Sequence, residues 1–172
     1  LLLVLPFWLT AQEETEKKQG YEFTPVKEVK VTSVKNQNRS GTCWSFATST
    51  FVESELLKMG KESLDLSEMF VVRKAYEEKA DLYVRMHGAA NFGGGGAVND
   101  VIDVIAKYGI MPEGAYSGLH YGTDKHVHGE LDKLLKAYVD VVVSNPNRKL
   151  STAWKKGFNG ILDAYLGAVP EK

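Results

Sequence analysis

Cysteine is almost absent from this sequence: Cys43 is the one cysteine among 172 residues. A single cysteine excludes an internal disulfide and a zinc site made of several thiolates. A surplus of positive charge is absent as well, because 21 basic residues are balanced by 22 acidic ones and the net charge is −1. With no basic run or patch in the sequence, we expect no nucleic-acid partner.

A long apolar run is also lacking at the N-terminus, where residues 1–11 (LLLVLPFWLTA) are too few to cross a bilayer as a helix. This stretch ends in small residues before a charged run, as the last part of a secretory signal peptide does, with cleavage after Ala11. A core strand at the N-terminus is the alternative. We therefore expect an exported bacterial protein, periplasmic or secreted, with no membrane partner in its mature form.

The rest of the chain divides into a polar lead-in, residues 12–28, and one domain, residues 29–172. Alternating apolar and polar residues predict a short half-buried strand from Val29 to Val34. Residues 42–59 have apolar side chains on several sides and predict a buried central helix. A second helix is predicted from Ser67 to about Lys79. Apolar periodicity predicts three more, at residues 98–108, 131–142 and 154–165, so the domain is mostly helical.

The chemistry of the sequence centres on Cys43, at the start of the first predicted helix. Unpaired backbone N–H groups and the helix dipole stabilise an anion at that position. The thiolate is the nucleophilic form of cysteine, and a helix N-terminus lowers a cysteine pKa below its ordinary value of about 8.5. Gly41 allows the loop to turn sharply into the helix. In the same loop, the side-chain amide of Gln37 can donate to a developing oxyanion together with the Cys43 backbone N–H.

This region resembles the papain family of cysteine peptidases. The signature around the family's nucleophile reads Cys-Gly-Ser/Ala-Cys-Trp/Tyr; here residues 40–44 read Ser-Gly-Thr-Cys-Trp, and Gln37 has the family's spacing. Residues 66–68, Leu-Ser-Glu, resemble the element that opens the family's second helix. Gly95 and Gly96, followed by a helix ending in Tyr-Gly, resemble the glycine pair whose backbone binds substrate in the cleft.

The resemblance covers roughly residues 28–117 and implies an α+β papain-like fold, of which this chain holds mainly the helical half. It implies that Cys43 attacks a peptide carbonyl to form an acyl-enzyme and that Gln37 belongs to the oxyanion hole. Gly95 and Gly96 would bind the substrate backbone. Trp44 would pack beside the site, although a core-filling role suits it equally well. The implied partner is a peptide substrate, and no cofactor is implied.

Two features resemble the bleomycin hydrolase (aminopeptidase C) branch of the family: the absence of disulfides and the passage Lys-Tyr-Gly-Ile-Met-Pro at residues 107–112. Known members of this branch are largely cytosolic hexamers with aminopeptidase activity. The resemblance therefore implies a possible homo-hexamer and makes the cytoplasm the alternative location.

The catalytic base of such an enzyme is a histidine, which an asparagine orients. Both lie roughly 130–150 residues after the nucleophile in papain-type chains. Counting from Cys43 passes Lys172, so we expect both residues to lie outside this sequence and the chain to be inactive alone.

The histidines that are present lack the strand context of the family's base; they are His87, His120, His126 and His128. His126 and His128 are two residues apart, so in an extended segment they would share a face and could be two ligands of a metal site. No convincing third ligand accompanies them beyond Glu130. We therefore expect a solvated polar loop and no metal site here.

Two other readings remain open for the whole chain. One is a papain-fold pseudoenzyme, a peptide-binding module that has lost its base. The retention of both Cys43 and Gln37 argues against it, since such a module needs neither. The other is a structural thiol in an unrelated helical protein.

Overall fold

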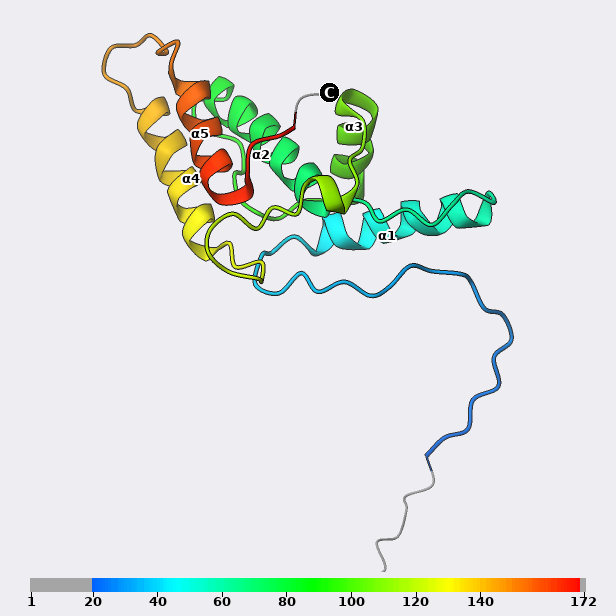
Figure 1. The fold of residues 1–172 in the computed structure, drawn as a ribbon. Helices are drawn as coiled ribbons and strands as arrows, with labels where there is room; N and C mark the ends of the chain where they lie inside the picture. The colour runs from blue at the N-terminus through cyan, green and yellow to red at the C-terminus, as the bar shows by residue number, and fades with distance from the viewer. Residues whose placement is uncertain (1–19, 171–172) are drawn as a thin grey trace, which may run out of the picture.

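A computed structural model describes residues 20–170 of the chain (Figure 1). The described residues form five α-helices and one 3-10 turn: α1 (Cys43–Lys58), α2 (Glu68–Arg85), α3 (Val98–Tyr108), η1 (Glu113–Ala115), α4 (Gly129–Val143) and α5 (Trp154–Leu166). They contain no β-strand, only isolated bridges between Arg39 and Val127 and between Leu66 and Pro112. Over residues 20–170 the predicted α+β fold is thus represented by helices alone. The predicted signal remnant, residues 1–11, lies outside the described residues.

Helix α2 is the central element, and it contacts each of the other four α-helices (Figure 1). It begins where predicted, because the Ser67 hydroxyl oxygen accepts the backbone N–H of Phe70 at 3.0 Å and so caps the first turn. It continues to Arg85, past the predicted end at Lys79. The extra turns are retained because Tyr83 and Val84 extend the buried face against the core.

Helix α1 has the predicted length but not the predicted burial throughout. Its first half is buried through Trp44 and Phe46, whereas Phe51 in the second half is 59% exposed. In this half the buried side chain is the polar Glu53, which is held by Lys35 and the Leu66 N–H, so the apolar pattern of α1 overstates its burial. The central position belongs to α2.

The predicted strand from Val29 to Val34 is absent, and this prediction is wrong for the described chain. Residues 20–34 have no regular structure (Figure 1), although the Thr32 hydroxyl donates to Glu53 of α1. Val34 is 99% exposed. An alternating pattern forms a strand only where a neighbouring strand can pair with its backbone, and residues 20–170 supply none.

Helices α4 and α5 contact each other and pack on α2 (Figure 1). The residues that fill this part of the core lie at helical spacing and are almost fully buried: Leu131, Leu135, Val139, Phe158 and Leu162. Gly109 and Gly167 stand at the ends of α3 and α5 with φ of 83° and 91°, a conformation that glycine adopts at little cost. None of the described helices is both long and apolar enough to cross a membrane.

Candidate active site

Cys43 is the first residue of α1, and its side chain is exposed. Thr42 precedes the helix and makes no side-chain cap; its hydroxyl is bonded to that of Ser40 instead. The backbone N–H groups of the first turn are therefore not occupied by a capping side chain. The Ser45 N–H donates to the Thr42 carbonyl at 2.9 Å, which leaves the N–H groups of Cys43 and Trp44 to face an anion at the helix terminus.

The loop that leads into Cys43 is tightly folded and is attached to another segment. Asn38 and Gly41 both have positive φ, 50° and 68°. Between them, the Arg39 N–H donates to the His126 carbonyl at 2.9 Å, and the His128 N–H donates to the Arg39 carbonyl at 3.1 Å. Gln37 lies in this loop and is partly exposed. We call residues 36–42 the nucleophile loop.

The glycine run, residues 93–96, contacts α1 at Trp44, the residue that follows Cys43. The Trp44 indole N–H donates to the Gly94 carbonyl at 2.9 Å. A Cβ atom on Gly96 would stand 2.6 Å from the Trp44 ring, so the backbone there lies directly against the indole. Gly95 has no atom within 4 Å of its Cβ position, and both Gly95 and Gly96 are exposed. Substrate binding by the backbone of this exposed pair stays a prediction.

Lys79 of α2 belongs to this site and was missed in the sequence. Its ammonium lies 5.1 Å from the centre of the Trp44 ring, within the range of a cation–π contact. The ammonium also donates to the Gly95 carbonyl. Burial lowers the pKa of Lys79, and the negative charges of Asp100 and Asp132 oppose that shift. Nothing in the sequence separates Lys79 from an ordinary surface lysine, because the contact depends on how α2 is placed.

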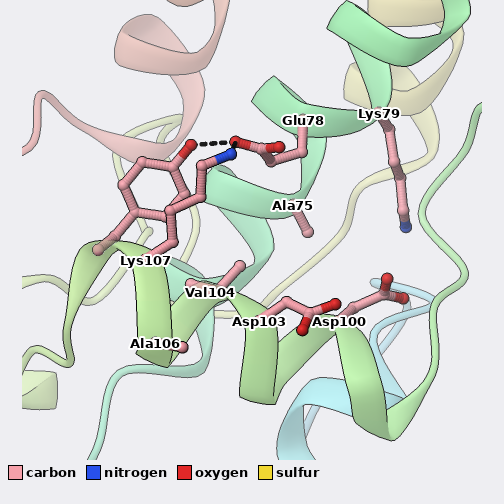
Figure 2. A pocket seen from close by; sticks show the side chains of 9 residues that line it. Ala75, Glu78, Lys79, Asp100, Asp103, Val104, Ala106 and Lys107 are labelled. Atoms are coloured by element: carbon pink, nitrogen blue, oxygen red, sulfur yellow. Dashed lines mark hydrogen bonds and ion pairs between the residues drawn. The ribbon is translucent and has the colours of Figure 1, made fainter.

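A hollow of about 390 Å³ lies between α2 and α3, next to the glycine run (Figure 2). Lys79 and Asp100 point toward each other across it. The Asp100 carboxylate also accepts the Ala97 N–H at 2.7 Å. At the other end, Glu78 accepts from Lys107 at 2.6 Å and from the Tyr108 hydroxyl. Of the charged side chains that line this hollow, Glu78 and Lys107 form an ion pair, whereas Lys79 and Asp100 bond to backbone groups of Gly95 and Ala97.

A cluster of charged side chains anchors the start of the nucleophile loop. The Lys35 ammonium lies 2.9 Å from Glu53, 2.6 Å from Asp65 and 2.8 Å from Glu68. Burial acts to lower the pKa of Lys35, but the hydrogen bonds that its ammonium donates to these carboxylates outweigh burial and raise that pKa. Burial, together with the charges of Glu68 and Asp65, raises the pKa of nearby Glu113 to about 7. Lys35 therefore fixes the chain two residues before Gln37.

The prediction of a solvated polar loop at His126 and His128 is wrong. His128 is 0% exposed. Neither of its ring nitrogens has a hydrogen-bond partner, and the buried Nδ1 of His126 has none either. The rings lie against each other with centroids 6.0 Å apart. Polar composition suggested solvent here, but the segment is drawn inward by its pairing with Arg39. In residues 20–170 no three His, Cys, Asp or Glu side chains are grouped to hold a metal ion.

Comparison with known proteins identifies the family. The family described as "Papain family cysteine protease" matches residues 21–157. The chain belongs to this family. Over 86 residues it is 36% identical to "Peptidase 1" of Psoroptes ovis, which covers 50% of this chain and 23% of that protein. Over 43 residues it is 46% identical to the "Viral cathepsin" of Lymantria dispar multicapsid nuclear polyhedrosis virus, covering 25% of this chain and 12% of the relative.

Among solved structures, the papain-family chain is similar to PepW from Lactobacillus rhamnosis HN001 with a TM-score of 0.60 and 21% identity. The similarity covers 87% of this chain and 40% of PepW, and it concerns the fold. The chain thus spans less than a quarter of the two curated relatives and under half of PepW. The predicted family is confirmed. The roles of Cys43, Gln37, Trp44, Gly95 and Gly96 stay predictions.

Proposed function

We propose that this chain is the nucleophile-bearing, helical part of a cysteine-type peptidase. Cys43 attacks the scissile carbonyl to give an acyl-enzyme, and the Gln37 amide and the Cys43 N–H hold the oxyanion. The observation that carries the proposal is an exposed thiol at a helix N-terminus without a side-chain cap, followed by Trp44, against which Gly96 of the exposed glycine pair packs. The base that takes the thiol proton, a histidine with its asparagine, comes from outside this chain.

We further propose that the peptidase acts in the manner of the bleomycin hydrolase branch, as an aminopeptidase and a homo-oligomer. The absence of a cysteine at residue 40 and the Lys-Tyr-Gly-Ile-Met-Pro passage support this assignment over disulfide-bonded papain relatives. Export to the periplasm or the exterior is a separate proposal, and it rests on the apolar stretch of residues 1–11.

The test is alkylation of the protein purified from its native source with a peptidyl epoxide that selects activated cysteine-peptidase thiols. We expect label on Cys43 in a polypeptide heavier than 19.1 kDa, the mass of this chain, and no label after Cys43→Ala. Hydrolysis of amino-terminal residues from peptides should be lost in the same variant.

A matched control separates thiol activation from mere exposure. Iodoacetamide, which requires no recognition of a peptide, should modify Cys43 in the native and the urea-unfolded protein alike, whereas the epoxide should act on the folded protein only. Equal epoxide labelling in both states, or none in the folded state, would refute the peptidase and favour the pseudoenzyme.

A further inference from the structure

The segment that carries His126 and His128 holds the nucleophile loop through its backbone. Two backbone hydrogen bonds join this segment to Arg39, whose N–H also donates to the Asn38 side chain, and the two form an isolated bridge rather than part of a sheet. Arg39 lies between Gln37 and Cys43 in the sequence. The position of the loop therefore depends on whether residues 126–128 stay in place.

The two imidazoles keep the segment in place by packing in largely apolar surroundings. The His126 ring meets Phe46 of α1 edge to face, with centroids 5.8 Å apart. The His128 ring meets Tyr121 in the same way at 6.2 Å. Three of the four ring nitrogens are buried without a hydrogen-bond partner. A buried polar group without a partner is costly, and a buried charge without one is far more costly.

The charged and titratable groups around the pair offer no counter-charge. The nucleophile loop contributes Arg39, whose side chain is exposed, and α1 contributes the uncharged Phe46. On the remaining sides, each polar group is engaged elsewhere: the Tyr121 hydroxyl with Lys125 and Val127, Glu130 of α4 with Tyr165 of α5, and Asp132 of α4 with Tyr76 of α2. Within residues 20–170, neither imidazole takes part in an ion pair with a carboxylate.

We propose that His126 and His128 are positioning residues for the nucleophile loop, and that they hold it only while both imidazoles are uncharged. We call the two packed imidazoles and the two hydrogen bonds between their segment and Arg39 the histidine latch. Its catalytic meaning rests on the proposed function, but the latch itself is a property of the fold. A proton on either ring places a cation where no acceptor is available. The segment then leaves its site, both hydrogen bonds to Arg39 break, and Gln37 and Cys43 lose their fixed relation.

The direction of the pH dependence follows from the burial of the rings. Burial lowers the pKa of His126, and burial with the charge of His126 lowers the pKa of His128 to about 4. An exposed histidine titrates near 6.5. Because the released segment binds protons more readily than the packed one, the latch is fully closed above about pH 6.5 and is progressively weakened as the pH falls toward 4.

Hydrogen exchange read by mass spectrometry tests the latch in the full-length protein between pH 7 and pH 4, with exposure times corrected for the intrinsic exchange rate. We expect peptides over residues 37–42 and 126–130 to lose protection together, by roughly 100-fold in the opening equilibrium. The core of α2 should stay protected. The double variant His126→Phe/His128→Phe, which keeps both aromatic rings but has no imidazole to take a proton, should retain protection of both peptides at pH 4. Each single variant keeps one imidazole and should lose part of that protection.

His120→Phe is the matched control, because it removes an exposed histidine outside the pair and should behave as the unmodified protein. Acid loss of protection in the double variant equal to that of the unmodified protein would overturn the proposal. So would protection that persists at pH 4 without substitution, or loss in α2 at the same pH. If the double variant does not fold, His126→Phe, at a partly exposed site, should lose less protection in acid than the unmodified protein, because only one ring can then take a proton, and an equal loss would overturn the proposal. The readout needs no reactive thiol, so an inert Cys43 with a working latch would refute only the peptidase.

Discussion

Replacing Lys35 with methionine is expected to lower the free energy of unfolding by about 3–5 kcal/mol, the cost typical of removing one partner from a buried ion pair. The Lys35 ammonium is the one positive charge between three carboxylates, and the side chains of Glu53 and Glu68 are 0% and 3% exposed. Methionine keeps the apolar stem but leaves these carboxylates without a counter-charge. Urea unfolding followed by circular dichroism measures the change.

The control for this prediction is Lys58→Met, because Lys58 also pairs with a glutamate, at 3.2 Å, but its side chain is 70% exposed. An exposed pair of this kind is worth well under about 1 kcal/mol. The deficit of Lys35→Met should shrink in acid, since protonated carboxyl groups no longer need the ammonium. A small loss that does not depend on pH would show that the cluster does not anchor the chain before Gln37.

Replacing Gly96 with alanine is expected to destabilise the protein by roughly 1–3 kcal/mol, as overpacking in a filled site does. The new methyl group would lie 2.6 Å from the Trp44 ring and 2.8 Å from the Asp100 carboxylate, which is closer than real Cβ contacts come. The indole must shift, and its hydrogen bond to the Gly94 carbonyl is then lost. Urea unfolding gives the stability, and the rate of epoxide labelling gives the effect on the site.

Gly95→Ala is the matched control, one residue away in the same run. Its Cβ would meet no atom within 4 Å, so we expect stability to change by less than about 0.5 kcal/mol. If the glycine pair binds the substrate backbone, Gly95→Ala slows epoxide labelling without destabilising the protein. Equal stability of the two variants would contradict the close contact between Gly96 and Trp44.

The sequence predicted the parts of the site that depend on local order. A thiol at the start of a helix, a glutamine in the preceding loop and a glycine pair before another helix are all readable along the chain. The ends of α3 and α5 were also predictable, because Gly109 and Gly167 mark C-termini through their positive φ. Each of these signals lies within a few residues of the structure that it specifies.

Features that depend on distant residues could not be predicted in this way. Lys35 meets Glu53 and Glu68 from 18 and 33 residues away, and no pattern in the sequence links them. His128 looked solvated because its neighbours are polar, yet a backbone bridge to Arg39 draws it into the core. The strand predicted at Val29–Val34 failed for the converse reason: its pattern was suitable, but the described residues provide no partner.

The contact between Trp44 and Gly94 affects how this part of the structure responds to reducing conditions. Papain relatives commonly join the nucleophile region to the glycine region by a disulfide. A reductant that keeps their catalytic thiol reduced can therefore also break this disulfide. In this chain the two regions are joined by a 2.9 Å hydrogen bond from the Trp44 indole N–H to the Gly94 carbonyl, and the one cysteine is Cys43, the proposed nucleophile. Strongly reducing conditions can therefore protect the thiol of Cys43 without breaking any bond in this part of the cleft.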